Sequence, residues 1–393
     1  MNEKVTGLVY RDSLADFERW LVDRNVGSFD ELTVSAAVLG KRRGAMADAA
    51  LLQTLITCLR TQGVESLNVV TEKSRGIIDE LDDAVSYGPG IAALAIAGRV
   101  RLMGVPVRKA VALHAAKSRV ESAYVGDFGM LTKGRVVDLL CVSGADRQYL
   151  KPLFESSSPV RVKDKYDLRA TVRGLAVAVN PVANKIIEDG IVNSLALLMH
   201  ELFENTQDHA ISDIHGRMYE RHVEGVFAGW MVLDPASSEL LGASQKLFGY
   251  GEAVLGSLTR NLRRPPSVHG FCFSFFDSGP GMAARYLSKS YHEMSLKEER
   301  NALYACLQSR KTSKVAHGTG EGFHEVLIEL ARVKGMIRIR SGRLAVFKCF
   351  DGSSTGDVWG GFGDWFGDST DLPEVAGTLI TVFVPSVGGS DEA

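Results

Sequence analysis

Apolar residues recur along the chain at two spacings, and each spacing predicts one kind of element. Helical spacing is clearest where Ile187, Val192, Leu195, Leu198 and Leu202 fall on related faces. The segments with helical spacing are 47–62, 183–210 and 323–333. The segments whose alternation or apolar and aromatic composition is typical of strands are 66–70, 135–142, 160–163, 271–276, 336–340 and 379–384. Helices and strands mixed in this order predict an α/β protein.

The segment 155–159 is the best candidate for a linker, because its serines and its proline favour an irregular connection. We therefore expect a small N-terminal α/β domain over 1–160, of unknown role, and a second domain over 161–387. The tract 351–371 is rich in Gly, Asp and Ser and reads as a loop held in place by Trp359 and Trp365. The last residues, 388–393, are expected to form a disordered tail.

Composition and charge narrow the class of protein. The chain has 393 residues with 45% hydrophobic and 23% charged residues, as in ordinary globular proteins, and its formal net charge of -2 gives no general attraction to nucleic acid. Its five cysteines contain no CxxC pair, which argues against disulfides and a zinc site. We find neither a signal peptide at the N-terminus nor an apolar stretch long enough to span a bilayer. These features predict a cytoplasmic protein without a membrane partner.

The first candidate site lies in the segment ELFENTQDHA, residues 201–210. On a helix, Glu201, Asn205 and Asp208 are separated by four and then three residues, so their side chains share one face. A carboxylate beside a carboxamide can orient a water and hold a cation. Because Mg²⁺ prefers a few protein oxygens together with phosphates and waters, the Asn205 oxygen suffices as the protein ligand.

The second candidate is the segment DSGPGM, residues 277–282, at the end of an apolar strand. The Asp277 carboxylate can accept a hydrogen bond from an exocyclic amine, and Gly279 and Gly281 let a flat ring approach the backbone. A plain turn would have the same composition.

The third candidate is the segment GTGEGF, residues 318–323, which directly precedes a predicted helix. Backbone N–H groups of a glycine-rich turn at a helix N-terminus favour phosphate, and Lys311 and Lys314 lie just upstream. The segment fits neither a Walker loop nor a dinucleotide-binding fingerprint. The charged, partly helical segment 283–317 would be a mobile cover, or lid, over a ligand bound between the second and third segments.

The order ELFENTQDHA, DSGPGM, GTGEGF and then GTLITVFVP resembles the Bergerat-type ATP-binding domain over roughly residues 165–387. That superfamily, called GHKL, includes gyrase, the heat-shock chaperone of ninety kilodaltons, sensor histidine kinases and MutL-type mismatch-repair ATPases. The resemblance implies a two-layer α/β sandwich, with a mixed, mostly antiparallel sheet and helices on one face. The N-terminal α/β domain would be separate from it.

The resemblance also implies roles for particular residues, with ATP and Mg²⁺ as cofactors. Glu201 matches the general base toward the attacking water, Asn205 the magnesium ligand, and Asp277 the residue that reads the adenine amine. Thr378 matches a threonine near the adenine on the last strand. The other residues expected to line the nucleotide site are Asp208, Gly279, Gly281, Met282, Lys311, Lys314, Gly318, Thr319, Gly320, Gly322 and Phe323.

The chain departs from the family pattern in two places. About 70 residues separate Asn205 from Asp277, which predicts an insertion around 211–268. Glu321 replaces the leucine that opens the helix in many kinase relatives. Neither departure removes a proposed ligand.

Three functions remain open. The first is a Mg²⁺-dependent ATPase or an ATP-gated switch that acts on a protein partner. The second is a protein kinase of the anti-sigma (Ser/Thr) or histidine-kinase-like type, although His200 is a poor phosphoacceptor because Glu201 belongs to the nucleotide helix. The third is a nucleotide sensor without catalysis. The resemblance also allows a homodimer, because many relatives dimerise on ATP.

Overall fold

The structure, a computed structural model, describes residues 13–24, 30–60, 64–71, 77–182, 185, 187–234, 241–242, 249–251, 254, 267–308, 321–350, 358, 360–367 and 372–386. Several predicted features lie outside the described residues. They are Lys311, Lys314, Gly318, Thr319, Gly320, Trp359 and the tail 388–393.

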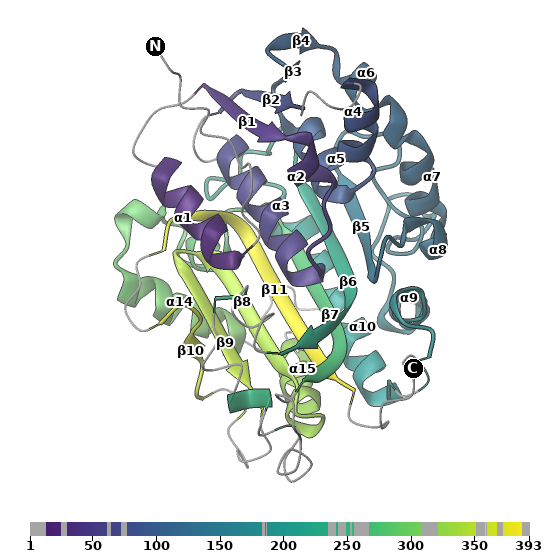
Figure 1. The fold of residues 1–393 in the computed structure, drawn as a ribbon. Coiled ribbons are helices and arrows are strands. Elements are labelled where there is room, and N and C mark those ends of the chain that lie inside the picture. The colour runs from purple at the N-terminus through teal and green to yellow at the C-terminus, as the bar shows by residue number, and fades with distance from the viewer. Residues whose placement is uncertain are drawn as a thin grey trace.

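A seven-stranded sheet forms the centre of the molecule, with every pair of neighbouring strands antiparallel (Figure 1). Its strand order is β10-β9-β8-β11-β7-β6-β5. The strands are β5 (Val136–Val142), β6 (Val223–Leu233), β7 (Val268–Asp277), β8 (Met336–Gly342), β9 (Leu344–Cys349), β10 (Gly363–Asp364) and β11 (Val375–Pro385). The strands predicted at 135–142, 271–276, 336–340 and 379–384 are confirmed, and so is the α/β class.

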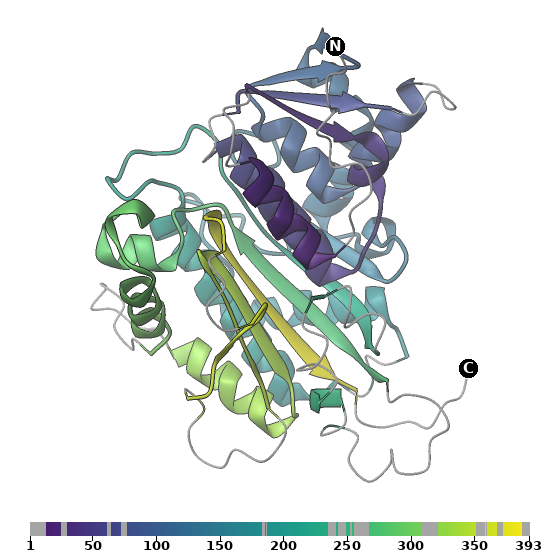
Figure 2. The same ribbon diagram turned by 60° about the vertical axis from the view of Figure 1, so that its left-hand side comes forward.

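A second, four-stranded sheet lies beside the first one and is built from the N-terminal part of the chain (Figure 2). Its strands are β1 (Glu31–Ser35), β2 (Ser66–Val70), β3 (Arg99–Leu102) and β4 (Val105–Val107). The first three are parallel and β4 closes a hairpin with β3. Parallel neighbours need crossover helices. The helices between them are α2 (Ala36–Gly40), α3 (Ala45–Arg60), α4 (Ile77–Val85) and α5 (Gly88–Ile96).

Helices cover both faces of the large sheet, and we name each face after its helix. The α10 face is covered by α9 (Lys165–Val179), α10 (Asp189–Asn205) and α15 (Glu321–Arg332). The α3 face is covered by α3, with α1 (Leu14–Arg24) packed against that helix. The remaining helices are α6 (Lys109–Ala112), η1 (His114–Ala116), α7 (Lys117–Val125), α8 (Phe128–Leu131), α13 (Met282–Leu287), η5 (Tyr291–Glu293) and α14 (Leu296–Gln308). The two-layer expectation concerned 161–387, whose helices α9, α10 and α15 cover one face, and helices of the N-terminal part add a third layer on the other face.

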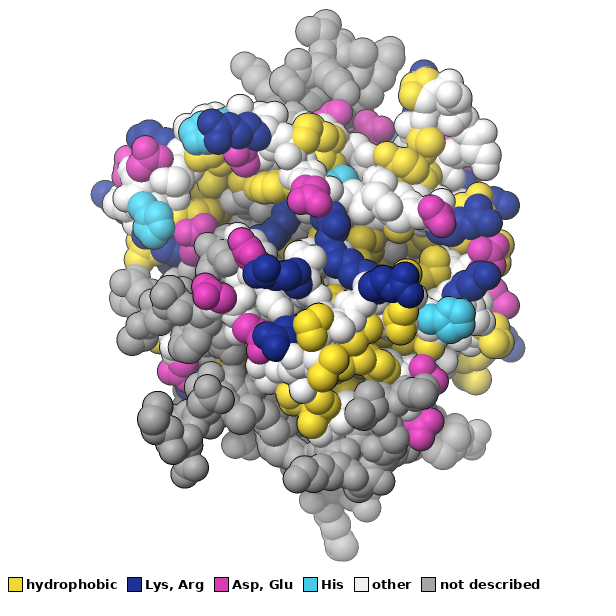
Figure 3. Space-filling model, turned by 90° about the horizontal axis from the view of Figure 1, so that it is seen from above, with side chains coloured by type: hydrophobic (Ala, Val, Ile, Leu, Met, Phe, Trp, Pro, Cys, Tyr) yellow, Lys and Arg dark blue, Asp and Glu magenta, His cyan; other side chains and the backbone are white. Residues whose placement is uncertain are grey.

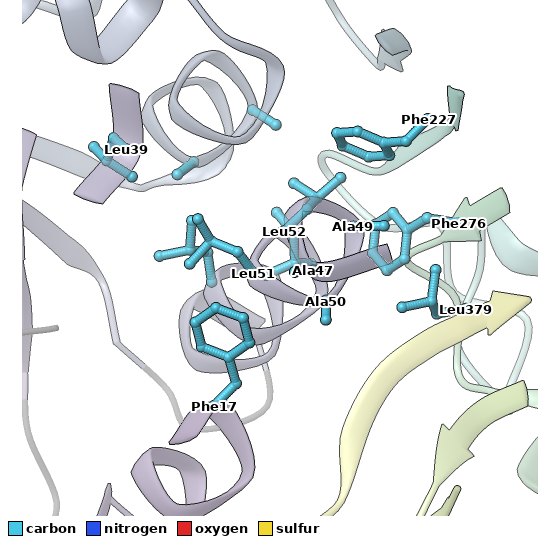
Figure 4. Close-up of a cluster of buried hydrophobic side chains, with 14 of the residues drawn as sticks. Phe17, Leu39, Ala47, Ala49, Ala50, Leu51, Leu52, Phe227, Phe276 and Leu379 are labelled. Atoms are coloured by element: carbon cyan, nitrogen blue, oxygen red, sulfur yellow. The ribbon is translucent and has the colours of Figure 1, made fainter. Parts of the chain in front are cut away.

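Helix α3 joins the N-terminal part of the chain to the large sheet. Its alanines let the helix lie close to the strands, and Figure 4 shows Ala49 beside Phe276 of β7, with Leu51 on the other side of the helix toward Phe17 of α1. Polar contacts add to this packing. Gln53 Nε2 donates to the carbonyl oxygens of Arg340 and Ala376 at 3.3 and 3.2 Å.

Three details of the predicted organisation change. Residues 1–160 do not pack separately, because β5 pairs with β6 in the large sheet and α3 shares its core. The strand predicted at 160–163 is wrong, since only a single bridge joins Val162 to Phe154. The segment 211–268, expected to contain an insertion, contains strand β6, which lies between β5 and β7 in the large sheet. The first and third changes follow from pairing between strands far apart in the chain, which local patterns do not record.

Candidate nucleotide site

One row of side chains crosses the α10 face, formed by residues that pair with one another across five neighbouring strands. The register pairs Cys141 with Glu224, Glu224 with Asp277, Asp277 with Thr378, and Thr378 with Ser341. Successive residues of a strand point to opposite faces. On each of the five strands the residue two positions away toward the core, such as Val226 or Ile380, lies in the core of the α10 face. These five residues, which we call the polar row, therefore border that core.

A small pocket lies between the polar row and α10. Its volume is about 20 Å³, enough for one water, so a larger ligand requires the covering side chains to move outward. The residues that line it are Leu202, Phe203, Thr206, Glu224, Gly225, Phe275, Phe276, Asp277, Thr378 and Ile380. The pocket thus lies between α10 and two of the later segments singled out in the sequence.

Asp277 lies at the centre of the polar row. Its Oδ1 accepts a hydrogen bond from Gly279 N at 2.8 Å. Burial raises the pKa of Asp277 to about 6, although hydrogen bonds from Gly279 and Thr378 and the charge of Arg60 favour the ionised form. The carboxylate is therefore ionised at neutral pH, with hydrogen-bonding capacity left for a donor in the pocket.

The backbone around Asp277 is held by two glycines in left-handed conformations. Gly377 has φ +67, and a Cβ there would lie 1.7 Å from the carbonyl oxygen of Asp277. Its N–H donates to Gly279 O at 2.7 Å, which ties the segment DSGPGM to the last strand. Gly281 has φ +86, and its Cβ would lie 2.3 Å from the Tyr291 hydroxyl. Only glycine fits such close approaches without displacement.

Thr378 and Ser341 continue the polar row. The two hydroxyl oxygens lie 3.2 Å apart, and Ser341 Oγ accepts a hydrogen bond from Met282 N at 3.0 Å. The expected residues Asp277, Gly279, Gly281, Met282 and Thr378 are thereby brought together at one end of the sheet.

Helix α10 and the turn after it do not place Glu201, Asn205 and Asp208 on the expected single face. Glu201 and Asn205 lie four residues apart in α10, the first half-buried and the second exposed. After Asn205 the chain widens into a π-helical turn, η3 (Thr206–Ala210), which holds the exposed Asp208. The α-helical spacing from Glu201 therefore does not extend to Asp208. Leu202, Phe203 and Thr206 line the pocket, so Glu201 and Asn205 lie on the neighbouring part of the helix surface.

The third segment is only partly described. Gly322 belongs to the first turn of α15, and α15 packs beside α10. Phe323 is buried in the core of the α10 face and is not among the residues that line the pocket.

Two residues near the pocket were not among the site residues predicted from the sequence. Arg60, at the end of α3, donates hydrogen bonds to the carbonyl oxygens of Ser278 and Arg221, and its guanidinium carbon lies 3.7 Å from the centre of the Tyr219 ring. Burial lowers the pKa of Arg60 to about 10, which leaves it charged beside Asp277 at neutral pH. Glu224, the second residue of β6, is only 1% exposed. Neither residue belongs to a motif, so only the pairing of distant segments reveals them.

A larger cavity of about 550 Å³ lies between α5, α7 and β5. Its apolar walls carry as many acidic as basic side chains, and two pairs are joined as ion pairs, Arg119 with Asp138 and Arg147 with Glu121. This charge balance favours no class of ligand. Figure 3 shows one outer face of the molecule, seen from above. On this face, Lys and Arg side chains form a row, and Asp and Glu side chains lie beside them.

Within the described residues, no group of three His, Cys, Asp or Glu side chains is placed to hold a metal ion, and no helix is long and apolar enough to cross a membrane. A scan against protein-family models and searches of curated proteins and of solved structures found no match to this chain.

Proposed function

We propose that this protein binds ATP between α10 and the polar row, and that the nucleotide controls its action on a protein partner. The observation that carries the proposal is the placement of Asp277, Thr378 and the wall of α10 around one pocket. A buried, ionised carboxylate accepts hydrogen bonds strongly, and the exocyclic amine of adenine supplies the donor. The apolar side chains of Leu202, Phe203 and Ile380 suit the faces of a purine.

The phosphates would extend from this pocket along α10 toward the start of α15. Asn205 presents an exposed carboxamide there, which fits a single protein oxygen for Mg²⁺ that is otherwise held by phosphates and water. Bound Mg²⁺ would offset the phosphate charge. Glu201 lies one helical turn before Asn205 and is the residue we assign to orienting and deprotonating a water. These roles make hydrolysis the leading proposal.

We favour the kinase alternative less than ATP hydrolysis. His200 Nδ1 lies 2.9 Å from the carbonyl oxygen of Lys163, so this half-buried ring is engaged with the backbone at the start of the domain. A structural histidine of this kind is a poor phosphoacceptor. A sensor without catalysis would use the same pocket without turnover.

The test measures ATP affinity by calorimetry with Mg²⁺ present, together with phosphate release. In Asp277→Asn, Gly279 N still holds the side-chain oxygen, which turns the new NH₂ group toward the adenine amine. We expect affinity to fall about tenfold or more, while Glu201→Ala binds ATP and loses turnover. Asp167→Asn, on the exposed surface of α9, is the matched control. Unchanged affinity in Asp277→Asn would refute the adenine assignment, and a parent that binds ATP without turnover would be a sensor.

A further inference from the structure

Glu224 is a buried carboxyl that the proposed ATP site does not yet use. It pairs directly with Asp277 across β6 and β7 and lines the same pocket. Directly opposite residues on one face of a sheet have Cβ atoms about 5 Å apart. Two carboxyl groups therefore share this end of the pocket. Burying a carboxyl is costly unless it is partnered or neutral.

The hydrogen bonds of Glu224 are incomplete. Its Oε1 accepts from Gln207 Nε2 at 2.6 Å, whereas its Oε2 is buried and has no hydrogen-bond partner among the described residues. Among the described residues, no cationic side chain forms an ion pair with Glu224. The other titratable neighbours are Asp277 and the thiol of Cys141, neither of which is a cation.

This environment favours the neutral acid. Burial and the negative charge of Asp277 raise the pKa of Glu224 well above its usual value. Because Oε1 already accepts from Gln207, the proton belongs on Oε2. The pocket then presents an O–H donor from Glu224 beside an ionised acceptor from Asp277.

We infer that Glu224 is a second base-reading residue, whose Oε2–H donates a hydrogen bond to a ring nitrogen of adenine next to the amine that Asp277 accepts. This inference rests on the proposed function. Adenine carries an amine donor flanked by the acceptors N1 and N7. A donor and an acceptor side by side on the protein match that edge, and a buried donor left without a partner penalises a base that lacks the acceptor.

The experiment compares Mg·ATP with 1-deaza-ATP and 7-deaza-ATP, each of which lacks one of the two ring acceptors. We expect the parent to bind one of the two analogues about tenfold more weakly than ATP. Glu224→Met removes the donor and keeps a side chain of similar length. It should bind ATP about as weakly as the parent binds that analogue, and it should bind ATP and that analogue with equal affinity. Glu224→Gln keeps an N–H donor at the position of Oε2 and should bind ATP like the parent.

The control is Glu65→Met, at an exposed site of the N-terminal part. Thermal unfolding checks that each variant folds, and the analogue series on the parent needs no variant at all. If Glu224→Met weakens ATP and both analogues by the same factor, or if Glu224→Gln binds as weakly as Glu224→Met, the inference is wrong while ATP binding stands. A parent that binds no ATP overturns the proposed function as well.

Discussion

The two faces of the large sheet are built from the same strands but close in different ways. On the α3 face, Phe227, Phe276 and Leu379 pack against an alanine-rich helix, and the contact is apolar over most of its length. On the α10 face, the apolar core ends at the polar row, where Glu224, Asp277 and Thr378 border a pocket. Both faces bury apolar cores, but only the α10 face ends in a polar-edged pocket, which is where we propose that ATP binds.

The largest difference between the two faces is expected when a phenylalanine of each face is replaced by alanine. Phe227→Ala removes a fully buried ring of the α3 face, whose centre lies 6.2 Å from that of Tyr87. We expect the free energy of unfolding to fall by about 3–5 kcal/mol because a cavity forms, with ATP affinity of the folded protein unchanged. Phe275→Ala, on the pocket wall of the α10 face, should lower both quantities. Denaturant titration and calorimetry measure them, and an ATP defect in Phe227→Ala would show that the faces are not independent.

A smaller effect on ATP affinity is expected when the pH is lowered. The pKa of Asp277 is about 6, raised by burial, and only the ionised form accepts the adenine amine with both charge and lone pairs. As pH falls through 6 the carboxylate gains a proton, so ATP affinity should fall by up to about tenfold per pH unit. The measurement is the ratio of affinities of the parent and Asp277→Asn from pH 5 to 8, because titration of the phosphates cancels in that ratio. A ratio that stays constant would contradict the assigned role of Asp277.

The smallest effect compares two buried hydroxyl pairs, one on each face. Thr378 and Ser341 form the pair of the polar row, and Ser274 and Thr381, 2.9 Å apart, form the pair on the α3 face. Thr378→Val should weaken ATP binding about fivefold, since one neutral hydrogen bond near the ligand is lost. Thr381→Val should lower the free energy of unfolding by about 1–2 kcal/mol and leave ATP affinity unchanged. Equal effects of the two substitutions on ATP affinity would argue against a site on the α10 face.

Much of the local structure followed from the sequence. The alternation over 336–340 and the aromatic run over 271–276 predicted β8 and β7, and the helix predicted over 323–333 corresponds to α15, which begins two residues earlier at Glu321. The strand β6 was missed even though it is rich in β-branched and aromatic residues. Both of its faces are buried, so the polar and apolar alternation that reveals a half-exposed strand is absent.

The sequence by itself determined the residues of the proposed ATP site that belong to motifs, Asp277, Thr378 and the glycines, because each carries a local chemical or conformational signature. Only the tertiary structure decided that β5 and α3 join the large sheet, and that Arg60 and Glu224 stand beside Asp277. Pairing between strands far apart in the chain depends on which surfaces bury one another, and no local spacing records it. The segment from 201 to 210 shows the same division: its sequence predicted a helix, but not the π-helical turn that contains Asp208.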